Sequence, residues 1–170
     1  MHIELKSCTV RSYKIQDAES LAKYANNRKV WLNLRDGFPH PYSTENALNF
    51  INRAINSQPE TNFAICVDDK AAGGIGFSLH SDVERISAEI GYWLGEPFWG
   101  KGITTEALKA VTEYAIKNHN LQRVYAVPYD TNKPSFRVLE KAGYQLEGRM
   151  RKSAIKDGKI IDQLLYAFVV

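Results

Sequence analysis

Hydrophobic residues follow two spacings along the chain, and each change of spacing predicts a change of secondary structure. Apolar residues at steps of three and four predict amphipathic helices, because they share one helix face. A further short helix is expected where Asn132 or Thr131 can cap its start, Pro134 falls in its first turn and Gly143 follows its end. The expected helices span about 17–25, 43–56, 102–118 and 132–142.

Short apolar runs bounded by polar turns predict β-strands between these helices. Asp157 and Gly158 separate the last two runs, and this dipeptide favours a tight hairpin. The expected strands span about 4–14, 62–67, 71–79, 86–94, 123–127, 144–155 and 160–169. This order of strands and helices predicts an α/β (α+β) domain with a single mixed, mostly antiparallel sheet and helices on both of its faces.

The composition is that of a globular protein. Of the 170 residues, 44% are hydrophobic and 24% are charged, which excludes wholesale disorder. The length suits a single domain over residues 1–170. No apolar run approaches the roughly 18 residues of a membrane-spanning helix. Charge begins at Glu4, and no signal-peptide stretch follows it, so we expect a cytoplasmic protein with no membrane partner.

Cysteine and histidine residues indicate neither a disulfide nor a metal site. Cys8 and Cys66 are far apart in sequence and lie among apolar residues, so we expect two buried free thiols. The histidines show no metal-ligand spacing, and no metal is expected. They are His2, His40, His80 and His119.

Net charge is uneven along the chain. The total of +3 divides into −2 over residues 1–100 and +5 over residues 101–170. A modest positive end suits an anionic small ligand, although most of these charges are also typical of a solvated surface. Basic and acidic residues are too interleaved for the basic stripe of a nucleic-acid-binding protein, so no nucleic acid is expected.

A glycine-containing loop directly precedes the third expected helix. Free N–H groups at a helix start can bind an anion, and Gly100 and Gly102 would let a phosphate approach the backbone. An ordinary strand-to-helix turn is an equal alternative. Thr105 replaces the third glycine of a dinucleotide fingerprint, and the Gly-Lys pair lacks the Ser or Thr of a P-loop. A pyrophosphate loop of another α/β fold is therefore the favoured interpretation.

Four stretches together resemble the GNAT acetyltransferase superfamily, and within it the branch of Rim-type ribosomal-protein N-terminal acetyltransferases. They are EIGYWL at 89–94, FWGKGITTEA at 98–107, NKPSFRVLEKAGY at 132–144 and EG at 147–148. The resemblance implies the GNAT acyl-CoA N-acyltransferase fold and acetyl-CoA as co-substrate. It implies direct transfer of acetyl, in a ternary complex, to a primary amine on a protein N-terminus or a small molecule. A monomer or homodimer is expected.

The resemblance also implies where acetyl-CoA binds. The strand ending at residue 94 should separate from the strand at 123–127, and the pantetheine arm should lie in the gap. Trp99 and Thr104 depart from the family's pyrophosphate motif, whose first and last positions are Gln or Arg and Gly or Ala. The implied cofactor-binding residues are Tyr92, Trp93, Leu94, Trp99, Gly100, Lys101, Gly102, Ile103, Thr104, Asn132, Ser135 and Lys141. Asn132 could equally be only a helix cap, and Lys141 a solvated helix charge.

Acyl transfer to an amine needs a proton acceptor, because only a neutral amine attacks a thioester. Glu89, in an apolar strand, is the best candidate, with Asp162 and Glu147 as weaker ones. The open alternative is that Glu89 only orients the substrate or pairs with an arginine.

Ser135 is the candidate proton donor to the departing thiolate, and a backbone N–H near Trp93 could stabilise the oxyanion. A serine without a catalytic role is the alternative. Arg35 and loop 36–42 could line the acceptor pocket, or form a plain surface loop. A catalytically silent acyl-CoA-binding module is the alternative function.

Overall fold

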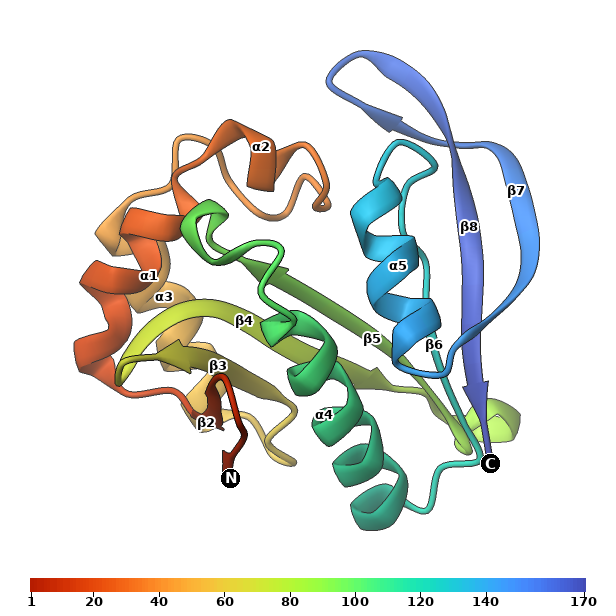
Figure 1. The fold of residues 1–170 in the computed structure, drawn as a ribbon, viewed down its shortest axis with the longest axis horizontal. Helices are drawn as coiled ribbons and strands as arrows, with labels where there is room; N and C mark the ends of the chain where they lie inside the picture. The colour runs from red at the N-terminus through yellow and green to blue at the C-terminus, as the bar shows by residue number, and fades with distance from the viewer.

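A computed structural model describes the whole chain, from Met1 to Val170. Eight strands form one sheet in the order β1-β2-β3-β4-β5-β6-β8-β7, and all neighbours are antiparallel except β5 and β6 (Figure 1). The strands are β1 (His2–Glu4), β2 (Thr9–Ser12), β3 (Asn62–Val67), β4 (Lys70–Leu79), β5 (Ser87–Leu94), β6 (Arg123–Ala126), β7 (Gln145–Lys156) and β8 (Lys159–Val169). The predicted mixed, mostly antiparallel sheet is confirmed.

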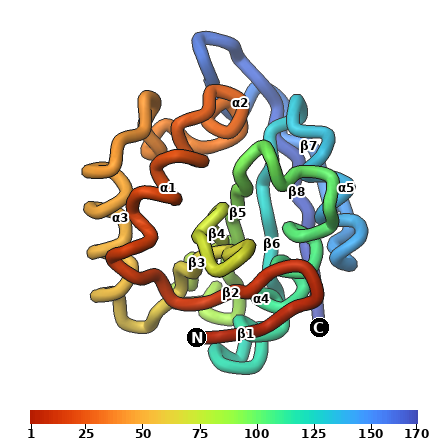
Figure 2. Tube along the Cα trace, turned by 60° about the vertical axis from the view of Figure 1, so that its left-hand side comes forward, coloured from red at the N-terminus to blue at the C-terminus, as the bar shows by residue number.

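Five α-helices cover this sheet. They are α1 (Ala18–Ala25), α2 (Arg28–Trp31), α3 (Thr44–Asn56), α4 (Ile103–His119) and α5 (Lys133–Lys141). Two buried clusters of side chains place α1 and α3 on one face and α4 and α5 on the other, as expected for helices on both faces (Figure 2).

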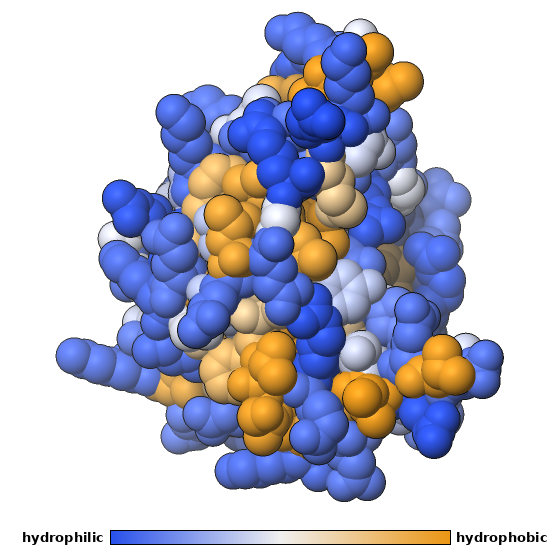
Figure 3. All heavy atoms as spheres, turned by 90° about the vertical axis from the view of Figure 1, so that its right-hand side faces the viewer, coloured by the Kyte–Doolittle hydropathy of each residue, from blue (hydrophilic) through white to orange (hydrophobic).

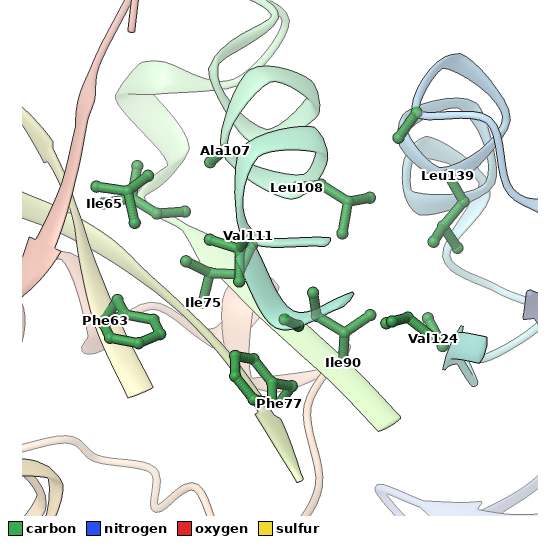
Figure 4. Packing of buried hydrophobic residues seen from close by; sticks show 14 of the residues in the cluster. Phe63, Ile65, Ile75, Phe77, Ile90, Ala107, Leu108, Val111, Val124 and Leu139 are labelled. Atoms are coloured by element: carbon green, nitrogen blue, oxygen red, sulfur yellow. The ribbon is translucent and has the colours of Figure 1, made fainter. Parts of the chain in front are cut away.

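The core therefore has two parts. Figure 4 shows the larger part, where Phe63 and Ile65 of β3 and Ile90 of β5 lie with Val111 of α4. Neighbouring residues of β3 face the smaller part under α1 and α3. A strand that is buried on both faces needs a continuous apolar run, and this explains the NFAICV sequence.

The first strand and the first connection differ from the prediction. The strand expected at 4–14 is a hairpin of β1 and β2, closed where the N–H of Leu5 donates to the carbonyl of Cys8. The four-residue helix α2 was not predicted, because one turn is too short to show a hydrophobic period. Asn27 caps it, since its side-chain oxygen accepts from the N–H of Lys29.

The expected free thiols are confirmed. Cys8 and Cys66 are unpaired and buried, at 7% and 2% exposure. Burial raises the pKa of each thiol to about 11, so both stay protonated at neutral pH. None of the helices has the length and hydropathy needed to cross a bilayer.

Candidate active site

The sheet opens between β5 and β6. These parallel strands pair only where Ser87–Glu89 lie beside Arg123–Tyr125, in three successive pairs. Beyond Glu89, β5 continues along β4 alone, whereas β6 ends and the chain turns away at Pro128. The separation implied by the resemblance is thus present, and it creates a cleft of about 500 Å³.

This cleft opens to both faces of the sheet. Successive residues of β5 point to opposite faces, and residues of both faces line the cleft. Trp93 packs on the cluster under α1 and α3, whereas Tyr92 packs on the cluster under α4 and α5. Glu89 and Gly91 share the face of Trp93. The cleft therefore has one side beneath the N-terminal helices and another beside α5, where Asn132 and Ser135 line it.

Backbone groups of β5 also face the opening. The N–H of Gly95 and the carbonyl of Ser87 bond to the β4 side, so odd-numbered residues of β5 use β4 as partner. The peptide groups of Tyr92 and Leu94 are directed the other way, where β6 no longer runs alongside. A free donor thus lies on either side of Trp93, and oxyanion binding by these groups stays a prediction.

On the α5 side, two hydroxyl groups are paired. The Oη of Tyr92 lies 2.7 Å from the Oγ of Ser135, which is 8% exposed. Burial raises the pKa of the Tyr92 phenol well above its ordinary value, and the bond to Ser135 opposes this only in part. The pair therefore keeps its protons at neutral pH and can donate one into the cleft.

On the opposite side, the Glu89 carboxylate forms an ion pair with the Arg35 guanidinium. The Glu89 side chain is 30% exposed, so it does not lie in apolar surroundings as its strand suggested. The reason is strand alternation: Ala88 and Ile90 are the buried positions, and Glu89 faces the cleft between them. The pairing with an arginine is therefore present, and a base role for Glu89 stays a prediction.

The two weaker candidates for the base lie outside the cleft. Glu147 is held by Arg123, and this contact lowers the pKa of its carboxyl. Asp162 accepts from the N–H of Lys152 and from Arg149, and both bonds lower its pKa. Both carboxylates therefore stabilise the C-terminal strands.

The glycine loop has the geometry of an anion cradle. Gly100 and Gly102 have φ of 74° and 81°, in the left-handed region that favours glycine. A Cβ added at either position would meet no atom within 4 Å, so open space lies beside the backbone. The first helical bond of α4 is donated by Glu106 to Gly102, and no N–H of residues 100–105 has an acceptor in the chain.

Trp99 joins this loop to the end of the separated strand. Its Nε1 donates to the carbonyl of Leu94 at 2.6 Å, while the residue as a whole is 44% exposed. This bond gives Trp99 a structural role where the family pattern has Gln or Arg. The Nζ of Lys101 lies 5.7 Å from the centroid of the Phe98 ring.

Of the remaining predicted cofactor residues, some lie at the cleft or the start of α4 and one does not. Asn132 lines the cleft and makes no side-chain capping bond, so the capping alternative is not observed. Ile103, the first residue of α4, is buried, and Thr104 follows it in the first turn of the helix. Lys141 is exposed at the end of α5 and does not line the cleft. Its solvated-charge interpretation therefore fits the structure.

Sequence reasoning missed the aromatic wall of the cleft. Phe38 lies with its ring centroid 4.7 Å from that of Tyr42 and 5.5 Å from that of Trp93. Tyr13 packs edge-on against Phe50 at 5.3 Å. Four of these five residues belong to no motif, and only the fold brings them together. The one indication in the sequence was loop 36–42, which was expected to line the acceptor pocket.

Ion pairs join loop 36–42 and α2 to the β7–β8 turn. The Nζ of Lys156 lies 2.7 Å from an oxygen of Asp36 and 3.7 Å from the centroid of Trp31. Arg28 of α2 bonds to Asp157 at 2.6 Å. We call these contacts the lid clamp. They hold α2 and loop 36–42 against the β7–β8 turn.

No cluster of three or more His, Cys, Asp or Glu side chains has the arrangement of a metal site.

Comparisons with known proteins agree with this geometry. Residues 8–145 match the model of the acetyltransferase (GNAT) domain. The uncharacterized N-acetyltransferase p20 of Bacillus licheniformis is 30% identical, over 95% of this chain and 92% of that protein. The ribosomal protein uS5-alanine N-acetyltransferase of Escherichia coli (strain K12) is 31% identical, over 93% and 85%. The crystal structure of the microcin C7 self-immunity acetyltransferase MccE, in complex with acetyl-CoA and AMP, has a TM-score of 0.82 at 28% identity and covers 98% of this chain and 94% of that one.

A mixed sheet that opens between two parallel strands, beside a glycine-containing helix start, defines an acyltransferase of the GNAT fold. The family model spans most of the chain, and the chain belongs to the acetyltransferase (GNAT) family. It is an N-acetyltransferase, as predicted, and its relatives include a ribosomal-protein N-acetyltransferase.

Proposed function

We propose that this enzyme transfers acetyl from acetyl-CoA to the α-amine of a peptide N-terminus or of a small molecule. One observation carries the proposal: the cleft passes through the sheet where β5 leaves β6. The paired hydroxyls of Tyr92 and Ser135 lie on one side, and the pair of Glu89 and Arg35 lies on the other. A thioester and an amine could therefore meet from opposite faces.

The loop before α4 fits the pyrophosphate of CoA. Its unpaired N–H groups and the positive end of the helix dipole favour negative charge, and Gly100 and Gly102 leave room for it. Asn132, with its free side-chain amide, would hold the arm of the cofactor beside α5. When bound, acetyl-CoA supplies the acetyl group as a thioester. MccE, whose structure contains acetyl-CoA, supports this assignment.

The side chains have complementary roles in the transfer. Glu89, oriented by Arg35, binds the amine and takes its proton directly or through water. The N–H groups of Tyr92 and Leu94 stabilise the charge that develops on the carbonyl oxygen. Ser135, backed by the Tyr92 phenol, gives a proton to the departing thiolate. Holding both reactants in one cleft supplies a further part of the rate by proximity.

We further propose that residues 1–170 act as one catalytic domain in the cytoplasm, as a monomer or homodimer, without a metal. The known acceptor of the uS5-alanine acetyltransferase relative supports an N-terminal amine. The lid clamp holds loop 36–42, whose Phe38 and Tyr42 line the cleft, and this supports a compact small molecule. Nucleic acid and membrane are not part of the proposed function.

The test is acetyl transfer to a mixed panel of N-terminal peptides and small amines, read as released thiol. We expect that EDTA leaves the turnover unchanged. The double variant Glu89→Gln, Ser135→Ala should lower the turnover about 100-fold or more. Unchanged turnover by the double variant would remove both residues from the chemistry. A wild-type protein that binds CoA but acetylates no member of the panel would favour the silent binding module.

A further inference from the structure

The acceptor side of the cleft has a floor without side chains. Gly76 and Gly91 are direct partners across β4 and β5, and both point toward α1 and α3. Along the same face, the next pair on one side is Trp93 with Gly74, and on the other Glu89 with Ser78. A two-glycine gap thus lies between an aromatic ring and the Glu89 carboxylate.

The two floor glycines have different reasons to be glycine. A Cβ at Gly76 would lie 2.5 Å from the Oδ1 of Asn62 and 2.8 Å from the carbonyl of Thr61, so packing explains that glycine. A Cβ at Gly91 would meet nothing within 4 Å, and Gly91 does not have the left-handed φ that favours glycine. Neither packing nor backbone conformation accounts for Gly91, whereas open space above the floor does.

The walls above this floor are aromatic. Trp93 and Phe38 meet edge to face, and Tyr42, Tyr13 and Phe50 continue the wall around the same side. Gly74 is part of this arrangement, because a Cβ there would lie 2.5 Å from the Tyr13 hydroxyl and 2.9 Å from the Trp93 indole nitrogen. The rings therefore lie close to the sheet and leave the space over Gly91 open.

We propose that Gly91 is the specificity-determining residue of an acceptor side-chain subsite, which takes an uncharged apolar or aromatic group next to the reacting amine. This inference rests on the proposed function and names the class of acceptor within it. The only charged side chains of the cleft, Glu89 and Arg35, are paired at its edge. A charged acceptor side chain over the glycine floor would lose its water without gaining an opposite charge.

The test uses tripeptides that differ only in their first residue, which is Gly, Leu, Phe or Glu. For the wild type, kcat/KM should be at least about tenfold higher for Leu or Phe than for Gly or Glu, because one methylene in an apolar pocket is worth that much. Gly91→Val should fill the floor and lower kcat/KM for Phe at least about tenfold relative to Gly, mainly through KM. Gly91→Ala should shift kcat/KM for Phe relative to Gly in the same direction as Gly91→Val, but by less.

Gly148→Val is the matched control. Gly148 lies in β7 outside the cleft, has open space at its Cβ position and does not have a left-handed φ, so the wild-type ranking should persist. Calorimetry with CoA verifies that each variant is folded. Two results would overturn the subsite alone: a wild type that prefers the Glu or Gly peptide, or a Gly91→Val variant in which kcat/KM falls equally for all four peptides. A wild type that binds CoA and acetylates no peptide or amine would overturn the proposed function, and the subsite with it.

Discussion

Gly102 is the residue at which backbone conformation and proposed ligand binding meet. Its φ of 81° is unfavourable for any residue with a Cβ, and the space beside it is open. Its helix start has no side-chain cap that could compete for the free N–H groups. These properties follow from glycines placed directly before a helix, which is why the loop could be predicted from the sequence.

Gly102→Val should therefore weaken CoA binding at least about tenfold, because the branched side chain would occupy the cradle and strain the turn. Gly158→Val is the control, since Gly158 has a similar φ of 72° and open space but lies in the β7–β8 turn. Calorimetry should show wild-type CoA affinity for the control only. Wild-type affinity in a folded Gly102→Val variant would contradict the cradle.

Single residues differ in how far the sequence could place them. Ser135 and Asn132 follow from the resemblance, and the structure brings both to the cleft. Glu89 lines the cleft but not in apolar surroundings, and its partner Arg35 is distant in sequence, so the ion pair could not be derived from strand chemistry. The aromatic wall was missed for the same reason: Tyr13, which follows β2, and Phe50 of α3 are distant in sequence, and only the fold brings them together.

Among the elements, α2 shows the limit of pattern reading. It is too short for a hydrophobic period, yet the lid clamp fixes its position against the β7–β8 turn. The hairpin turn itself followed from Asp157 and Gly158, and the long helices from their apolar faces. Lys156, although charged, is only 4% exposed, because its ammonium group lies between the Trp31 ring and Asp36.

Lys156→Met should loosen the lid clamp. The methionine keeps much of the apolar stem but loses the ion pair and the cation–π contact, at a cost of about 1–2 kcal/mol in the free energy of unfolding. We expect KM for the acceptor to rise severalfold while CoA affinity stays unchanged. Lys159→Met is the control, because Lys159 is exposed and forms no ion pair. An unchanged acceptor KM in Lys156→Met would show that the clamp does not shape the acceptor side.

At the scale of the whole molecule, the strand order was not predictable from local patterns. β8 lies between β6 and β7, and the only parallel pair is separated in sequence by α4. Long-range pairing of this kind follows from global packing, so the order of elements predicted the fold class, whereas the resemblance to a known family predicted the gap between β5 and β6. Figure 3 shows the face that lies on the right of Figure 1, where hydrophobic side chains form separate patches among hydrophilic ones.

Buried thiols and phenols predict how the stability of the whole fold depends on pH. The pKa of the Cys8 and Cys66 thiols is about 11 in the folded protein, against about 8.5 in an unfolded chain. Because the folded-state pKa is the higher, their contribution is complete below about pH 8.5 and is lost as the pH rises toward 11. Burial shifts the pKa of Tyr13, Tyr92 and Tyr144 in the same direction and extends the loss above about pH 10.

The free energy of unfolding, measured with urea, should therefore fall between pH 8 and pH 10.5. Each pKa unit of difference is worth about 1.4 kcal/mol per group. In the double variant Cys8→Ala, Cys66→Ala the decline between pH 8.5 and pH 10 should be shallower, although the variant starts from a lower stability. Constant or rising stability over this range would show that these groups ionise as readily in the folded state as in the unfolded chain.

The central claim, acetyl transfer to an α-amine held in the cleft between β5 and β6, has one most direct test. The measurement compares kcat/KM for a peptide with a free N-terminal leucine and for the same peptide blocked at its N-terminus but carrying a lysine. An α-amine loses its proton about two pH units more readily than a lysine amine, so the paired carboxylate of Glu89 suffices as its proton acceptor. The account predicts a ratio well above one for the free N-terminus over the lysine, and a ratio below one would contradict it.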